Sequence, residues 1–159
     1  MTEYINRIRS KLGKDKFIHP GARIIIENHI GEILFIERLD NGNLGIPAGS
    51  IEDDETIEEC IKREVKEETG LTIIDLEVIG ISTNPTLETI RYPNNDEIQY
   101  FTIEFYSNNW SGTIMIEDRN EIKCAKFKEL SNIDKLPKNE LSAFESLNYY
   151  RENKRIMLK

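Results

Sequence analysis

The chain has 159 residues and a formal net charge of −8 at pH 7. This length suits one domain with one core, and the acidic balance is opposite to that of proteins that bind nucleic-acid backbones. We find no signal peptide and no apolar run near the ~18 residues of a membrane span. The sequence therefore predicts a single cytoplasmic domain over 1–159 without a membrane or nucleic-acid partner, and it leaves a homodimer open.

The first segment, 1–13, has the pattern of an amphipathic helix, and Gly13 is a natural stop. Its apolar residues recur at helical spacing at Tyr4, Ile5, Ile8 and Leu12. Its other face carries Arg7, Arg9 and Lys11. The basic face permits a nucleic-acid or partner-binding arm, but we prefer a surface helix docked on the domain.

Several extended segments follow. Two β-branched runs, 22–27 and 32–37, flank a polar turn and predict a β-hairpin. The segment 44–47 predicts a short extended approach to the next helix, and strands are predicted at 72–80, 98–106 and 121–128. Aromatic residues on both faces of 98–106 indicate a central strand.

The last helix is predicted over 137–150, where Pro137 occupies a first position that tolerates proline. Leu141, Phe144 and Leu147 form its inward stripe. A strand-rich centre with three helices predicts an α/β fold, a mixed β-sheet sandwiched by helices.

The middle helix has clear ends. Thr56, followed three residues later by Glu59, is the signature of a capping box, and Gly70 can adopt the left-handed conformation that ends many helices. We therefore predict a helix over 57–69.

Carboxylates interrupt the inward face of this helix. Its apolar side is formed by Ile57, Cys60, Ile61 and Val65. Glu64 and Glu68 fall within the same arc and Glu67 lies beside it. Burying unpaired like charges is costly, so a cation is expected beside them. The i,i+4 pairs Glu58–Lys62 and Glu59–Arg63 belong on the solvent side.

Oxygen ligands favour Mg²⁺, with Mn²⁺ as an alternative, over zinc. The chain has only two histidines, far apart, and no cysteine pair at ligand spacing. Cys60 and Cys124 are interpreted as small buried hydrophobic residues. Neither a Gly-x-Ser-x-Gly elbow nor a P-loop is present, which removes the support for acyl transfer and P-loop chemistry.

The stretch 49–71 resembles the Nudix box at every defined position. The matching residues are Gly49, Glu55, Arg63, Glu64, Val65, Glu67, Glu68, Gly70 and Leu71. The resemblance implies an α/β/α sandwich and a Mg²⁺-dependent hydrolase that acts on a nucleoside diphosphate linked to another group. The match covers about a seventh of the chain, and it is more specific than a lone glycine-rich motif.

The resemblance also implies roles for particular residues. Metal ligands would be Glu64, Glu67, Glu68 and the carbonyl of Ala48. Glu64 or Glu68 would be the most important of them for catalysis. Arg63 is expected to hold neighbouring carboxylates through its planar guanidinium. Glu55 is interpreted either as a supporting residue or as an acidic residue that favours the helix N-terminus.

Family members usually carry one further acidic residue outside the box. Glu117, Asp118 and Glu121 precede the last strand, and we favour Glu121 as a metal ligand or general base.

Three residues are candidates for substrate binding. Arg23 and Arg38 lie on the predicted hairpin strands and could contact phosphate or ribose, although each is also explained as a surface arginine. Tyr92, in the turn 91–97, could stack on a base, and a simple hairpin tip explains it equally well.

The predicted partner is a small-molecule nucleotide. The Pro47-Ala48-Gly49 approach slightly favours ADP-ribose or a nucleotide sugar. The alternatives are a nucleoside triphosphate pyrophosphohydrolase, an RNA 5′ pyrophosphohydrolase and, in a different class, a catalytically silent nucleotide sensor.

Overall fold

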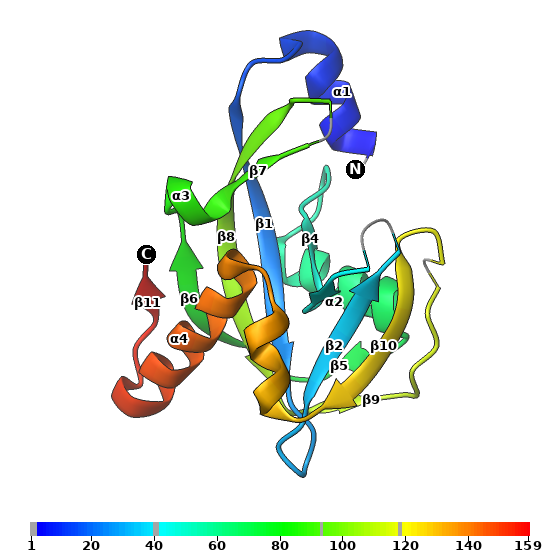
Figure 1. Cartoon of the computed structure of the whole chain (residues 1–159), viewed down its shortest axis with the longest axis vertical. Helices are drawn as coiled ribbons and strands as arrows, with labels where there is room; N and C mark the ends of the chain where they lie inside the picture. Colours follow the sequence, from blue (N-terminus) through cyan, green and yellow to red (C-terminus); the bar gives the residue numbers. More distant parts are fainter. Residues whose placement is uncertain (1–2, 40–41, 93, 118) are drawn as a thin grey trace.

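A computed structural model describes residues 3–39, 42–92, 94–117 and 119–159 (Figure 1). In chain order the elements are α1 (Glu3–Leu12), β1 (Phe17–Ile26), β2 (Ile33–Arg38), β3 (Leu44–Gly45), β4 (Ala48–Ser50), α2 (Ile57–Thr69), β5 (Thr72–Ile73), β6 (Glu77–Ser82), α3 (Pro85–Glu88), β7 (Thr89–Arg91), β8 (Glu97–Ser107), β9 (Trp110–Ser111), β10 (Ile122–Lys128), the 3₁₀ helix η1 (Leu130–Lys135), α4 (Lys138–Asn153) and β11 (Met157–Leu158).

The main sheet is mixed. Its strand order is β11-β6-β8-β1-β4, and β7 pairs with β8. The long strands β1 and β8 run parallel from Phe17↔Ile98 to Ile26↔Ser107, whereas β4 and β6 pair antiparallel with β1 and β8. A second, antiparallel sheet has the order β10-β2-β3.

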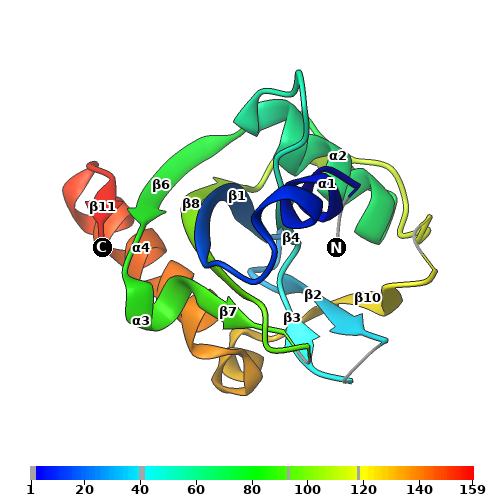
Figure 2. The same cartoon turned by 90° about the horizontal axis from the view of Figure 1, so that it is seen from above.

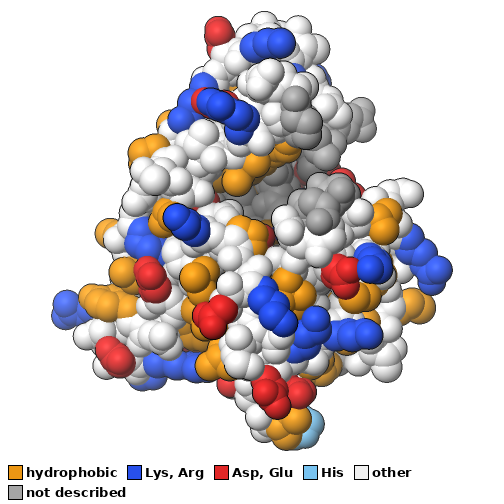
Figure 3. Space-filling view, viewed as in Figure 1, with side chains coloured by type: hydrophobic (Ala, Val, Ile, Leu, Met, Phe, Trp, Pro, Cys, Tyr) orange, Lys and Arg blue, Asp and Glu red, His pale blue; other side chains and the backbone are white. Residues whose placement is uncertain are grey.

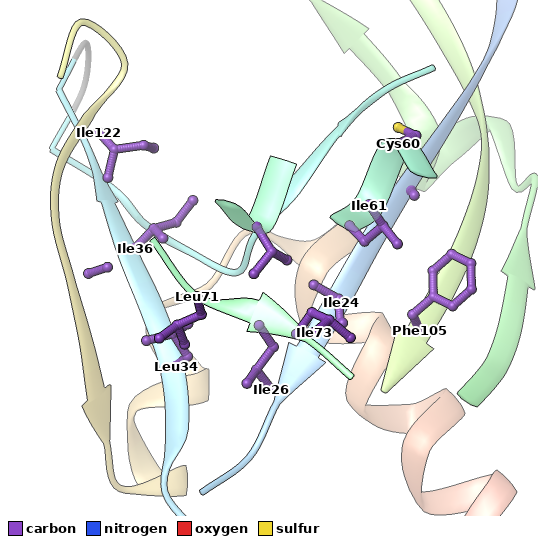
Figure 4. Close-up of a cluster of buried hydrophobic side chains, with 13 residues drawn as sticks. Ile24, Ile26, Leu34, Ile36, Cys60, Ile61, Leu71, Ile73, Phe105 and Ile122 are labelled. Atoms are coloured by element: carbon purple, nitrogen blue, oxygen red, sulfur yellow. The ribbon is translucent and has the colours of Figure 1, made fainter. Parts of the chain in front are cut away.

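Two hydrophobic cores lie on opposite faces of β1 and β2. Ile24 and Ile26 of β1 pack in one core with Ile61 of α2 (Figure 4). Ile25, which points the other way because side chains alternate along a strand, packs with Phe144 of α4. Figure 2 shows α2 and α4 on opposite sides of the strands. The predicted α/β/α sandwich is therefore confirmed.

Helix α2 has the predicted bounds, and its caps explain them. The Thr56 hydroxyl accepts a hydrogen bond from the Glu59 amide at 3.2 Å, and the Glu59 carboxylate accepts one from the Thr56 amide at 2.9 Å. Gly70 ends the helix with φ of 80°. These contacts satisfy backbone groups that a helix end leaves unpaired, so the helix is defined locally.

The predicted hairpin of 22–27 and 32–37 is wrong. Both strands exist, but only one bridge, Glu27↔Ile33, joins them. One edge of β1 is taken by β8 and the other by β4, so β2 pairs instead with β10 and β3. The turn brings the strands together, but they then diverge into separate sheets.

The single strand predicted at 72–80 is also wrong. β5 pairs with β9 and β6 pairs with β8. Between them the amides of Ile74 and Asp75 both donate to the carbonyl of Asn109, at 3.0 and 3.3 Å. This local arrangement turns the chain between the two partners.

The remaining predictions need smaller changes. β8 is a central strand and β10 begins one residue later than predicted, while α4 continues to Asn153. The predicted inward residue Leu141 is only half-buried. Cys60 is fully buried as predicted, whereas Cys124 is half-buried, with its thiol 3.4 Å from the Glu37 carboxylate. No helix within the described ranges is both long and apolar enough to span a membrane.

Candidate active site

A cavity of about 800 Å³ lies between the end of the molecule that carries α1 and the β2–β4 region. Figure 3 shows the surface hollowed there. Its wall brings together most of the predicted site residues: Arg23, Arg38, Ala48, Arg63, Glu64, Glu67, Tyr92 and Glu121. Segments that are up to about a hundred residues apart in the chain thus meet at one opening.

Arg63 on α2 organises the carboxylates. Its guanidinium donates two hydrogen bonds to Glu55, at 2.7 and 3.0 Å, and others to Glu64 at 2.8 Å and Glu67 at 3.2 Å. Arg63 therefore holds neighbouring carboxylates as predicted, and Glu55 is its bidentate partner. The predicted Glu59–Arg63 pair is wrong, because the Glu59 carboxylate is held in the capping box by Thr56.

These bonds also explain the state of Glu55. Burial, the largest single influence, raises the pKa of the Glu55 carboxyl, but the hydrogen bonds from Arg63 and from the Glu52 backbone together hold the pKa below its ordinary value. Glu55 is therefore a charged partner of Arg63, which supports the first of the two interpretations of this residue.

Glu64 lies against the glycine that opens the box. A Cβ atom on Gly49 would stand 2.0 Å from the Glu64 carboxyl carbon, so only glycine permits this approach. The Glu64 side chain is 12% exposed. Its pKa is raised to about 7, chiefly by burial; the nearby charges of Glu67 and Glu121 act in the same direction, and Arg63 opposes them.

Glu68 is more deeply buried than Glu64. One carboxylate oxygen accepts a hydrogen bond from the Ala48 amide at 3.2 Å. Burial raises its pKa well above the ordinary value, Arg38 lowers it, and the charge of Glu64 raises it again. Glu68 is therefore buried on the inward side of α2, against Ala48 of β4, as its place within the apolar arc predicted.

The described wall of the cavity contains six glutamates but only three arginines. Within the described ranges, no three His, Cys, Asp or Glu side chains form a ready cluster for a metal. Arg63 bonds to the carboxylates of Glu55, Glu64 and Glu67. The donors still fit a hard divalent cation. They are oxygen atoms, two of the carboxylates are raised in pKa by burial, and Gly49 leaves their approach open.

The two predicted substrate arginines are already paired with glutamates. Arg23 is 3% exposed, and its guanidinium contacts Glu88 and lies 3.9 Å from Glu104. Arg38 is more open, and its guanidinium lies 3.5 Å from the Glu140 carboxylate. Both reach the cavity, but neither is a simple surface arginine.

Tyr92 and the acidic loop also reach this region. The Tyr92 hydroxyl lies 3.1 Å from the Tyr100 hydroxyl. Glu121 is exposed at the cavity, whereas the Glu117 amide donates to the carbonyl of Glu67 at 2.9 Å. Asp118 lies outside the described residues. Roles for these groups in catalysis or binding stay predictions.

Sequence reasoning missed Glu140 on α4. Its carboxylate accepts a hydrogen bond from the Ile46 amide at 2.7 Å and faces Arg38. Burial raises the pKa of Glu140, which Arg38 and the Ile46 amide oppose. The only signal in the sequence was a glutamate in the first turn of a helix, which does not distinguish a buried acid from a helix-stabilising one.

Three comparisons with known proteins agree with this geometry. The NUDIX domain family model matches residues 17–149. An ADP-ribose pyrophosphatase of Methanocaldococcus jannaschii is 34% identical over 76% of this chain and 68% of its own length. An RNA pyrophosphohydrolase of a Marinomonas species is 41% identical, but that match spans only 38% of each chain.

Solved structures share the fold. The NUDIX domain of Shewanella oneidensis NrtR, complexed with ADP ribose, superposes with a TM-score of 0.67 at 19% identity, over 98% of this chain and all of that chain. A MutT protein from Methanosarcina mazei Go1 gives a TM-score of 0.67 at 24% identity, over 89% and 99% of the two chains. Together with the family match over 17–149, these findings show that this chain belongs to the Nudix hydrolase family.

Proposed function

We propose that this protein is a Mg²⁺-dependent pyrophosphohydrolase that cleaves nucleoside diphosphate derivatives, with ADP-ribose or a nucleotide sugar as the favoured class. One observation carries the proposal: the largely buried carboxylate of Glu64 and the partly exposed carboxylate of Glu67, both on α2, stand in the wall of a cavity of about 800 Å³, which is within the usual size of small-molecule sites. A buried acidic wall beside a nucleotide-sized space suits a site where a metal offsets the charge of both protein and diphosphate.

Glu64, Glu67, Glu68 and the Ala48 carbonyl would hold the metal. When bound, Mg²⁺ supplies charge neutralisation and lowers the pKa of a coordinated water. Arg63 keeps Glu64 and Glu67 oriented through bonds of 2.8 and 3.2 Å, and it is a positioning residue rather than a group that reacts.

Glu121 is the proposed proton acceptor or further ligand. It is exposed at the cavity, and its charge contributes to the raised pKa of Glu64, so the two carboxylates lie near each other. A carboxylate at this position can take the proton of a water that attacks phosphorus. Mn²⁺ could replace Mg²⁺, because both accept oxygen donors.

The favoured substrate class rests on relatives and on the arginines. The M. jannaschii relative is named an ADP-ribose pyrophosphatase, and its match covers 76% of this chain and 68% of its own length. Arg38, which is 26% exposed, is the better placed arginine for phosphate. Arg23 is enclosed by Glu88 and Glu104, so its role is to shape the cavity wall or to contact ribose.

A second candidate is an RNA 5′ or nucleoside triphosphate pyrophosphohydrolase. Relatives named RNA pyrophosphohydrolase and MutT-like protein match this chain at 40 to 41% identity, but these matches span only about two fifths of the chain. A silent nucleotide sensor is disfavoured, because every defined residue of the box is present.

The test is hydrolysis of a substrate panel, with substrates and products separated and quantified by anion-exchange chromatography. The panel contains ADP-ribose, a UDP-sugar, a nucleoside triphosphate and a 5′-triphosphate RNA, each with Mg²⁺ and with EDTA. We expect the highest kcat/KM for ADP-ribose or the UDP-sugar, and loss of turnover with EDTA or Glu64→Gln. Equal turnover in EDTA would overturn the metal requirement. No turnover of any substrate would favour the sensor.

A further inference from the structure

Helix α1 contributes to the cavity although it lies outside the matched family domain, which begins at residue 17. Ile5 is 1% exposed and lines the cavity. Ile8, one turn further along the same helix, is half-buried and is not among the described lining residues. Of these two isoleucines, Ile5 is therefore the one that faces the cavity.

α1 is fixed on both sides of the opening. The Arg9 guanidinium donates to the Glu97 carbonyl at 2.6 Å and lies 3.4 Å from the Asp96 carboxylate, and its side chain is 9% exposed. On the other side, the Arg7 guanidinium contacts Asp53 in the loop before α2. Figure 1 shows α1 near the start of β8. The helix therefore joins the hairpin to the box loop.

The hairpin supplies the facing wall. Ile90 and Tyr92 come from β7 and the residues after it, and Tyr100 comes from β8, and all three line the cavity. The hydroxyls of Tyr92 and Tyr100 lie 3.1 Å apart, and the Ser50 hydroxyl lies 3.3 Å from that of Tyr100. These contacts between hydroxyl groups restrain the ends of both tyrosine side chains.

Two parts of the cavity wall, here called its acidic and apolar ends, therefore differ in chemistry, and they adjoin where Tyr100 meets Ser50 of β4. Glu64, Glu67 and Arg63 stand at one end, where α2 meets β4. Ile5, Ile90 and the two tyrosines come from α1 and the hairpin. Apolar and aromatic side chains suit a planar, uncharged ring, because such a ring gains binding free energy from stacking and from leaving water.

We propose that α1 and the β7–β8 hairpin form the nucleobase-binding end of the cavity, and that Ile5 is a specificity-determining residue. The inference rests on the proposed function, because it assigns the part of the same substrate that is remote from the diphosphate. Ile5 is almost fully covered and backs this part of the wall, so α1 shapes the surface that discriminates base-bearing substrates from sugar phosphates.

The test measures binding without turnover. Isothermal titration with AMP and with UMP is compared with ribose 5-phosphate, which keeps the sugar and phosphate but lacks the base. We expect at least one nucleotide to bind about tenfold or more tightly than ribose 5-phosphate, since stacking of one base is worth about that factor. In Ile5→Ala this preference should fall several-fold, while the affinity for ribose 5-phosphate stays within twofold.

Two variants separate this role from a purely structural one. Ile8→Ala removes the same side chain from the same helix but not from the cavity, and it should keep the preference for a base. Arg9→Ala breaks the anchor at the Glu97 carbonyl, and it should reduce the preference as Ile5→Ala does. Circular dichroism and thermal unfolding establish that each variant is folded.

The proposal is overturned if neither nucleotide binds more tightly than ribose 5-phosphate. It is also overturned if Ile8→Ala has the same effect as Ile5→Ala, which would make α1 a docked structural helix only. Failure of the proposed function looks different: a base preference that depends on Ile5, with no hydrolysis of any panel substrate, would remove the enzyme activity and keep the binding role.

Discussion

The two ends of the cavity are built in different ways. The acidic end comes from one continuous stretch, 49–68, in which a glycine, a loop and one helix place Glu64 beside Gly49. The apolar end is assembled from α1, β7 and β8, whose lining residues are up to about ninety-five positions apart. Chemistry that must stay fixed is encoded locally, whereas the surface that selects a substrate depends on how distant segments are brought together.

The comparison predicts that damage at the acidic end affects turnover, with little effect on folding. Glu64→Gln, and separately Glu68→Gln, should lower kcat by about 10²- to 10⁴-fold, the range of a lost acid–base or ligand group. The amide keeps the shape of the side chain but is a poor ligand. Steady-state kinetics in Mg²⁺ measures the effect.

Glu58→Gln is the matched control, because Glu58 lies on the same helix and its carboxylate pairs with Lys62 at 2.6 Å on the exposed side. It should retain parental activity. If Glu64→Gln and Glu68→Gln both remain active, the assigned roles of the box carboxylates are wrong.

The acidic end should also make the metal-free protein less stable as the pH rises. The pKa of Glu64 is raised from 4.5 to about 7 by burial, so the folded state holds its proton more tightly than the unfolded state. This stabilisation is complete below pH 4.5 and is lost as pH rises through about 7, at a cost of about 3 kcal/mol. Denaturant unfolding in EDTA from pH 4 to 8 measures it.

Glu64→Gln provides the reference for this titration, since it keeps the side chain but cannot ionise. The difference in unfolding free energy between the parent and the variant should change with pH over this window, and Mg²⁺ should reduce the loss at high pH. Parallel profiles for the two proteins would contradict the raised pKa.

The sequence predicts structure that depends on near neighbours better than structure that depends on distant segments. The bounds of α2 were predicted because Thr56, Glu59 and Gly70 define them through bonds to near neighbours. The hairpin prediction failed because the partner of a strand is not local: β1 pairs with β8, whose residues lie some eighty positions later. Turn chemistry indicates where a chain reverses but not which edges later become occupied.

The same limit applies to the site. Glu64, Glu67 and Arg63 could be identified from a motif, and they line the cavity. Glu140 could not, because its partners Ile46 and Arg38 lie about a hundred residues earlier. Arg23 was recognised as basic, but its enclosure by distant carboxylates leaves no mark in the local sequence.

Gly49→Ala tests whether the acidic end depends on the close contact between Gly49 and Glu64. The new methyl group would stand 2.0 Å from the Glu64 carboxyl carbon, so the loop or Glu64 must move, at a cost of about 1–3 kcal/mol. The midpoint temperature of thermal unfolding and kcat should both fall. In a Glu64→Ala background the clash is absent, so the stability cost of Gly49→Ala should largely disappear. Equal costs in both backgrounds would refute the contact.

The smallest expected effect concerns His19, whose neighbour Tyr100 belongs to the apolar end. Here the protein loses stability as the pH falls, whereas at the acidic end it loses stability as the pH rises. His19 is 1% exposed, and its ring lies 5.4 Å from that of Tyr4 and 5.9 Å from that of Tyr100. Burial lowers the pKa of His19 from 6.5, and a hydrogen bond with the Ile51 backbone offsets part of this shift. The unfolded chain therefore binds the proton first, and stability is lost as pH falls below 6.5.

NMR titration of the two histidines measures this directly. The His19 signals should titrate below pH 6.5, with His29 on the exposed turn as the second signal in the same sample. In His19→Gln, which keeps a donor but cannot be charged, the loss of stability between pH 6.5 and 5 should diminish. A His19 that titrates at or above pH 6.5 would contradict the lowered pKa, whereas the prediction for the acidic end would be unaffected.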